Sequence, residues 1–172
     1  MPTFSKPLRL CLLGAGLTAL VLFAAWAAGL RVNVTASLPR GLYLLCPGTP
    51  GRGDFAAFCL TGEFAALAGE RGYVLAGSCV SGLRPLLKRV AALPGDVVDA
   101  SALPLRATDS QGRPLPSALH SGVVPPGMAL LLADHPGSFD GRYFGLVPLA
   151  SLQRVRPLFA TSHTQEFEHA DR

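Results

Sequence analysis

The run Pro-Leu-Leu-Lys-Arg-Val-Ala-Ala-Leu-Pro-Gly-Asp at residues 85–96 is the most hydrophobic stretch of the chain after its first 30 residues. An apolar run that ends in a Pro-Gly-Asp turn is typical of a buried β strand. Alternation along this strand puts one cation on each face, Lys88 on one and Arg89 on the other. The alternation alone therefore does not decide which of the two points into the protein.

The chemistry of the two side chains favours Lys88 as the inward cation. Thirteen of the 15 basic residues are arginines, and the only lysines are Lys6 and Lys88. An arginine keeps its proton at any working pH, whereas a desolvated lysine can lose it. Burial would lower the pKa of Lys88 from ~10.4 toward ~7–8, which suits a general base. The alternative is a lysine at a strand edge that reaches solvent.

The rest of the chain predicts a mainly β fold, a small antiparallel domain. Short apolar runs separated by Gly and Pro are typical of such domains. Residues 63–71 predict one or two helical turns, and residues 100–127, rich in Pro, Gly and Ser, predict a surface excursion with at most a small hairpin. The predicted extended segments and strands are residues 32–35, 42–45, 54–60, 85–93, 128–133 and 142–147.

One transmembrane helix is predicted in front of this domain. Residues 10–30 contain no charge and are long enough for a hydrocarbon core of ~30 Å. Lys6 and Arg9 precede them, so the positive-inside rule leaves residues 1–9 in the cytoplasm and exports residues 31–160. Residues 161–172 predict a frayed tail. A cleaved signal peptide, with Ala25-Trp26-Ala27 as its cleavage site, is the alternative to a retained anchor.

The net charge and the cysteines further restrict the function and the cellular compartment that the sequence allows. The net charge of +4 is mild and its basic residues are scattered, which excludes nucleic-acid binding. Cys11 lies in the predicted anchor, and the other three cysteines lie in the exported part, where disulfides persist. Cys59 and Cys79 flank a loop-like stretch and are the favoured pair, with Cys46 left over. The alternative is three small buried thiols.

The stretch Thr35-Ala36-Ser37-Leu38-Pro39 follows closely after the anchor. A serine between an extended segment and a proline can project into a cleft, and only residues 31–36 separate it from the membrane. On its own, this pattern is a weak signal and is more typical of an ordinary turn serine.

Three blocks occur in a familiar order: residues 37–43 (Ser-Leu-Pro-Arg-Gly-Leu-Tyr), residues 85–96, and residues 138–145 (Ser-Phe-Asp-Gly-Arg-Tyr-Phe-Gly). Together they resemble the signal peptidase I superfamily of Ser-Lys peptidases, most closely its TraF-type branch from conjugative plasmid transfer systems. Two departures from general leader peptidases favour that branch. Pro39 lies two residues after Ser37 instead of three, and a short Asp134-His135-Pro136 replaces their longer box before the last block.

The resemblance implies a role for each matched residue. Ser37 would be the nucleophile and Lys88 its general base. Thr35 would help the Ser37 N–H form the oxyanion hole, Ser138 would orient the lysine, and Asp140 and Arg142 would form a supporting ion pair. An ordinary Asp-Gly turn is the alternative for the last block. His135, a competing base in principle, is interpreted as a loop residue.

The implied activity is removal of signal peptides from exported precursors at the bacterial inner membrane, with the catalytic domain in the periplasm. The expected partners are the lipid bilayer, a membrane-bound pilin-like precursor and other conjugation components, with no cofactor and no metal. Maturation of a conjugative pilin, including its cyclisation, is the favoured role. A general signal peptidase and a non-catalytic assembly protein of a secretion channel are the alternatives.

Overall fold

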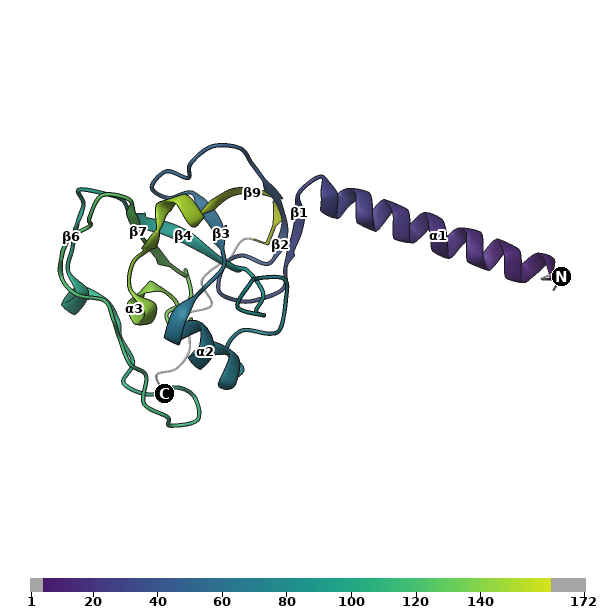
Figure 1. The fold of residues 1–172 in the computed structure, drawn as a ribbon. Helices are drawn as coiled ribbons and strands as arrows, with labels where there is room; N and C mark the ends of the chain where they lie inside the picture. The colour runs from purple at the N-terminus through teal and green to yellow at the C-terminus, as the bar shows by residue number, and fades with distance from the viewer. Residues whose placement is uncertain (1–4, 162–172) are drawn as a thin grey trace, which may run out of the picture.

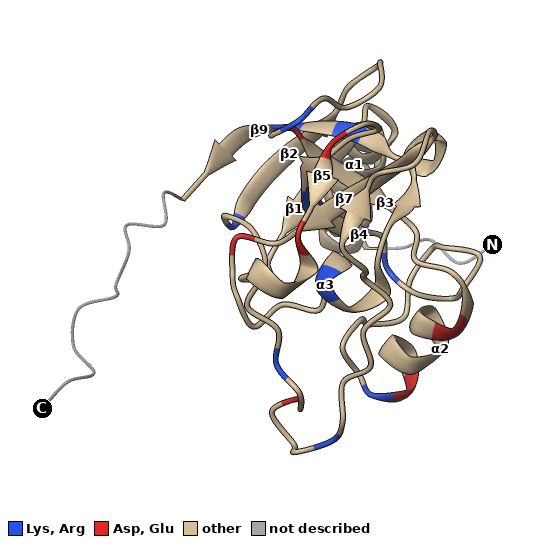
Figure 2. Cartoon of the chain, turned by 90° about the vertical axis from the view of Figure 1, so that its left-hand side faces the viewer, with Lys and Arg blue, Asp and Glu red and all other residues tan. Residues whose placement is uncertain are grey.

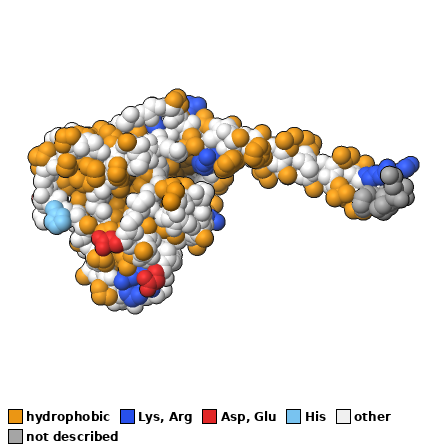
Figure 3. Space-filling view, viewed as in Figure 1, with side chains coloured by type: hydrophobic (Ala, Val, Ile, Leu, Met, Phe, Trp, Pro, Cys, Tyr) orange, Lys and Arg blue, Asp and Glu red, His pale blue; other side chains and the backbone are white. Residues whose placement is uncertain are grey.

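The computed structural model describes residues 5–161, and its first element is a long apolar helix. Helix α1 (Lys6–Ala27) projects away from the β domain (Figure 1), and an 18-residue stretch of it has a mean hydropathy of 2.2, so the helix is long and apolar enough to cross a membrane. Figure 3 shows hydrophobic side chains along the helix and basic ones at its N-terminal end. The helix begins at Lys6, before the predicted span 10–30, and it ends earlier than predicted because Gly29 adopts φ +89° and Leu30 starts a strand.

The domain behind the helix is an antiparallel β structure, which confirms the predicted fold class. Seven strands form one sheet in the order β1-β2-β9-β3-β4-β7-β8, and β5 and β6 form a second, small sheet. The strands are β1 (Leu30–Asn33), β2 (Gly41–Leu45), β3 (Phe55–Phe58), β4 (Leu86–Ala92), β5 (Val97–Val98), β6 (Gly122–Val123), β7 (Met128–Leu132), β8 (Val147–Pro148) and β9 (Gln153–Ala160).

Strand β4 lies inside the sheet, between β3 and β7, as its apolar sequence predicts. Lys88, Val90 and Ala92 are buried on one face, and the core forms around Val90 together with side chains of β3, β7 and the short helix α2 (Gly62–Glu70). Arg89 points the other way, and its side chain is 39% exposed. The structure thus resolves the choice between the two cations in favour of Lys88.

Two features of the C-terminal third differ from the prediction. Residues 142–147 were predicted as a strand, but Gly141–Phe144 form the short helix α3, because the Asp140 side chain caps it by accepting from the Arg142 N–H. Strand β9 was not predicted, although it pairs with both β2 and β3.

Residues 100–127 contain the 3₁₀ turn η1 (Ala100–Ala102) and strand β6, in line with a mainly irregular excursion. A second 3₁₀ turn, η2 (Leu149–Ser151), precedes β9. The predicted frayed tail lies, from residue 162 on, outside the described residues.

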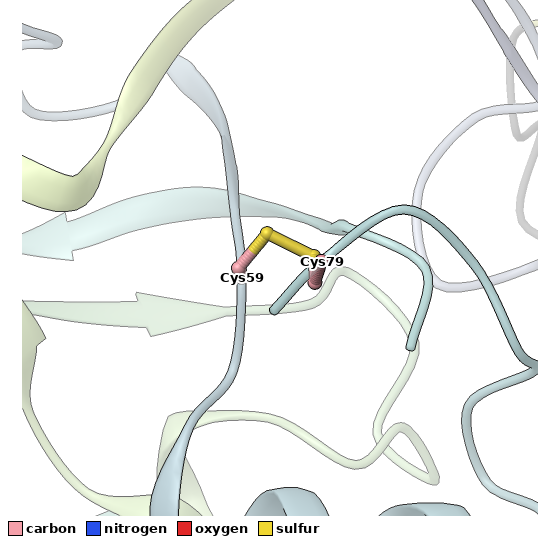
Figure 4. The surroundings of a disulfide bond; sticks show 2 residues. All are labelled: Cys59 and Cys79. Carbon is pink, nitrogen blue, oxygen red and sulfur yellow. A yellow bond between two sulfur atoms is a disulfide. The ribbon is translucent and has the colours of Figure 1, made fainter. Parts of the chain in front are cut away.

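The structure contains the predicted disulfide. Cys59, directly after β3, is bonded to Cys79, and their Cα atoms are 5.6 Å apart (Figure 4). The bond closes the segment that includes α2. Cys46 is a free, partly buried thiol.

Removal of this disulfide should destabilise the domain without changing its packing. We expect the Cys59→Ser/Cys79→Ser variant to lose about 3 kcal/mol of unfolding free energy, because the closed loop of about 20 residues regains freedom in the unfolded chain. Denaturant unfolding of the detergent-solubilised protein measures the loss, and Cys46→Ser, which leaves the bond intact, is the matched control. Equal stability of both variants would contradict the prediction.

Candidate active site

Ser37 lies in the short connection between β1 and β2. Ala36 and Ser37 form the centre of a turn, and the neighbouring Leu38 is fully buried and anchors the loop to the domain. The Ser37 hydroxyl accepts a hydrogen bond from Ser138 Oγ at 3.1 Å. Residues 37 and 138, 101 positions apart in the chain, therefore meet at one point.

A cleft of about 300 Å³ opens beside this pair of hydroxyls. One wall is the loop of Ala36 and Ser37, a second is formed by residues 137–139, and a third comes from residues 106–115 together with Tyr73. The sequence did not predict that the excursion at residues 100–127 contributes to the site. It was missed because its irregular sequence gives no sign that the Tyr73 hydroxyl donates to Asp109 and holds the excursion over the cleft.

Lys88 is buried, with 2% of its surface exposed. Desolvation lowers the pKa of its ammonium to about 8; Asp140 opposes this effect and Arg142 adds to it. Lys88 makes no salt bridge and no side-chain hydrogen bond to any described residue. A substantial fraction of this lysine is therefore neutral just above neutral pH, as a general base requires.

A chain of contacts connects the Ser37 loop to the strand that carries Lys88. The Asp134 N–H donates to the Ser37 carbonyl at 3.0 Å. The Asp134 carboxylate in turn accepts two hydrogen bonds from Arg89, at 3.0 and 2.9 Å, and the Arg89 guanidinium lies 4.3 Å from the Phe55 ring centroid. The residue after Lys88 thus fixes the backbone of Ser37 through one aspartate.

Asp140 and Arg142 form a buried ion pair, their side chains 0% and 4% exposed. The pair is bidentate, with N–O distances of 2.9 and 2.6 Å, and Asp140 also accepts from the Ala133 N–H at 2.8 Å. The Arg142 guanidinium donates further bonds to the carbonyl oxygens of residues 133, 135 and 136. Helix α3, which carries Arg142, packs against β7 (both labelled in Figure 2). The pair therefore fixes the loop that carries Asp134 and Ser138.

The two remaining predicted residues lie at the site, but in different contacts from those the resemblance implies. Ser138 is hydrogen-bonded to Ser37, and its hydroxyl makes no hydrogen bond to Lys88. The Thr35 hydroxyl donates to Asn33 Oδ1 at 2.8 Å. Their assigned roles, orientation of the lysine and completion of the oxyanion hole, stay predictions. Among residues 5–161 there is no cluster of three or more His, Cys, Asp or Glu side chains that could hold a metal ion.

Comparison with known proteins identifies the family to which this chain belongs. The family profile described as signal peptidase, peptidase S26, matches residues 6–155, which include every residue of the candidate site. The chain belongs to this family. The S26 fold thus accounts for the antiparallel domain behind an apolar helix.

Relatives of this chain are conjugation proteins by name. A conjugal transfer protein TraF of Agrobacterium fabrum is 37% identical over 163 residues, which is 84% of this chain and 92% of the relative. A plasmid transfer protein TraF of Escherichia coli is 39% identical over 162 residues, 84% of this chain and 90% of the relative. The likeness thus extends over nearly the whole of each protein.

Proposed function

We propose that this chain is a membrane-anchored serine endopeptidase that matures a pilin-like precursor of a conjugation system. The observation that carries the proposal is a buried lysine with a lowered pKa in the same domain as a cleft that exposes Ser37. The S26 family supports peptidase chemistry, and the names of the relatives support a role in conjugation. Helix α1, with Lys6 and Arg9 at its start, would anchor the domain on the periplasmic side of the inner membrane.

The proposed reaction is acyl transfer. Neutral Lys88 accepts the proton of Ser37 Oγ as the oxygen attacks the scissile carbonyl. Lys88 and Ser37 share no hydrogen bond in the structure, so the two side chains must approach as substrate binds, as is common for sites without substrate. The Ser37 N–H, which donates to no described residue, stabilises the oxyanion.

The second half of the reaction releases the product. Lys88 gives its proton to the departing amine as the peptide bond breaks. Water, or the N-terminal amine of the substrate itself, then attacks the acyl-enzyme and gives a proton to the neutral Lys88. The bond between the acyl carbon and Ser37 Oγ breaks, and Lys88 returns the proton to Ser37 Oγ. Attack by water gives a linear peptide, and attack by the amine gives a cyclic one.

The anchor favours a substrate that is itself held in the bilayer. Only residues 28–36 lie between the end of α1 and Ser37, so the cleft stays near the membrane surface. A precursor held in the same bilayer meets the cleft at a raised effective concentration.

Mass spectrometry of a pilin precursor incubated with the full-length protein in vesicles tests the proposal. We expect a shortened product with the wild type and only intact precursor with Ser37→Ala. A product lighter by one water than the linear fragment identifies cyclisation. An uncleaved precursor with the wild type would contradict the proposal, and equal cleavage of unrelated exported precursors would favour a general signal peptidase.

A further inference from the structure

Asn33 is the only asparagine in the sequence, and its side chain is buried at the end of β1. Its Oδ1 accepts from the Thr35 N–H at 3.1 Å and from the Thr35 hydroxyl at 2.8 Å. Its Nδ2 lies 3.1 Å from the carbonyl oxygens of Leu38 and Pro39, and 3.3 Å from that of Thr35. Both lone pairs and both hydrogens of the amide are therefore used within one loop.

This loop carries Ser37, and four of its carbonyl groups, those of residues 35, 37, 38 and 39, accept hydrogen bonds from the protein. Asn33 binds three of them, and the Asp134 N–H binds the carbonyl of Ser37 itself. The Tyr43 hydroxyl donates a second bond to the Pro39 carbonyl, at 2.6 Å. The Ser37 N–H, by contrast, donates to no described residue, so it is free to face a substrate.

We propose that Asn33 is a positioning residue for catalysis, one that holds the turn at Ser37 so that the nucleophile and its free N–H face the cleft together. The inference rests on the proposed function and adds a residue that no motif identifies. Asn33 is not among the residues that line the cleft, so it acts through the loop and not on the substrate.

A purely structural asparagine would be expected to form hydrogen bonds to neighbouring strands of the sheet. The side-chain contacts of Asn33 are instead confined to the Ser37 loop. Asn33 is the last residue of β1, and its side chain makes no hydrogen bond to any described residue outside 35–39. A misplacement of about 1 Å in a reacting group can cost on the order of 10²-fold in rate, and loss of one oxyanion donor costs a similar factor. Loosening this loop is therefore expected to slow the reaction.

Steady-state kinetics on the full-length protein in detergent tests the proposal. We expect Asn33→Ala to lower kcat by about 10²-fold while KM stays within about twofold, since the cleft itself is unchanged. Asn33→Asp, of equal size, keeps the acceptors for Thr35 but cannot donate to the Leu38 and Pro39 carbonyls, and we expect a similar loss. Val34→Ala is the matched control, because the neighbouring Val34 side chain is 66% exposed.

Amide hydrogen exchange provides a second readout that does not depend on activity. We expect the Thr35 amide to exchange about tenfold or more faster in Asn33→Ala, while the paired amides of β1 and β2 keep their protection. Wild-type kcat in a folded Asn33→Asp protein, or unchanged Thr35 exchange in Asn33→Ala, would overturn the proposal. A wild type that cleaves no precursor would instead refute the proposed function, and exchange would still decide whether Asn33 holds the loop.

Discussion

Replacement of Lys88 by methionine is expected to abolish cleavage and at the same time to stabilise the domain at neutral pH. Methionine matches the length of the aliphatic stem but has no amine, so it cannot accept the Ser37 proton. It also removes a cation from a site with 2% exposure, where desolvation lowers the pKa of Lys88 to about 8. The gain in stability should be about 3 kcal/mol, the equivalent of the difference between a pKa of about 8 and the unfolded value near 10.4.

The pH dependence of this stabilisation has a definite sign. Between pH ~8 and ~10.4 the unfolded state holds the Lys88 proton and the folded state does not. Unfolding therefore takes up a proton, and wild-type stability rises with pH through that window. Below it, Lys88 is charged in both states and the full cost of burial remains. Denaturant unfolding of wild type and Lys88→Met at several pH values should show a difference that is largest near pH 7 and vanishes above pH ~10.4.

The variant Lys88→Arg keeps the positive charge at this position but cannot act as a base. Its guanidinium remains protonated far above neutral pH, so we expect no detectable cleavage, as with Ser37→Ala. Arg89→Lys is the control: the side chain is exposed, a lysine can keep one contact to Asp134, and we expect less than about tenfold loss. Wild-type activity should rise with pH through about 8. Substantial cleavage by Lys88→Arg or Lys88→Met would refute the Ser-Lys dyad.

Sequence reasoning found the parts of the fold that have a strong local signal. Strand β4 and the neighbouring strand β7 are apolar runs between turn signals, and both were predicted close to their observed bounds. The inward orientation of Lys88 was predicted from chemistry after alternation had failed to choose. Strand β9 was missed because only Val155 of its eight residues is buried, so the segment has no apolar alternation and even contains a proline.

The contacts within the candidate site could not be predicted, because they join chain segments that are far apart in the sequence. The blocks that carry Ser37, Lys88 and Ser138 were found by their resemblance, but their mutual contacts follow from the antiparallel topology. Helix α3 was mistaken for a strand because four residues, Gly141–Phe144, are too few to show a period, and the capping bond from Asp140 decides the conformation. No role was predicted for Asn33, because a single polar residue in an extended segment does not indicate which carbonyl groups its side chain will bind.

The largest loss of stability is expected for Asp140→Asn. The substitution leaves the Arg142 guanidinium, 4% exposed, without its negative partner, and breaking a buried pair in this way typically costs about 3–5 kcal/mol. Activity should fall as well, because Arg142 and Asp140 together hold residues 133–136, and with them the Asp134 N–H that binds the Ser37 carbonyl. Thermal unfolding and the cleavage assay measure the two effects. Arg154→Gln, which breaks the exposed pair with Asp54, is the control and should cost less than about 1 kcal/mol.

A double variant shows whether the loss comes from the ion pair or from the shape of the turn. Asp140→Asn combined with Arg142→Gln removes both charges, so no lone buried cation remains. We expect this protein to be less destabilised than the sum of the two single variants, with a coupling of about 1–3 kcal/mol between residues in direct contact. Its activity should stay low, since a neutral amide pair does not restore the fork that orients residues 133–136. Additive losses, or an unchanged melting temperature with full activity in Asp140→Asn, would reduce the motif to an ordinary Asp-Gly turn.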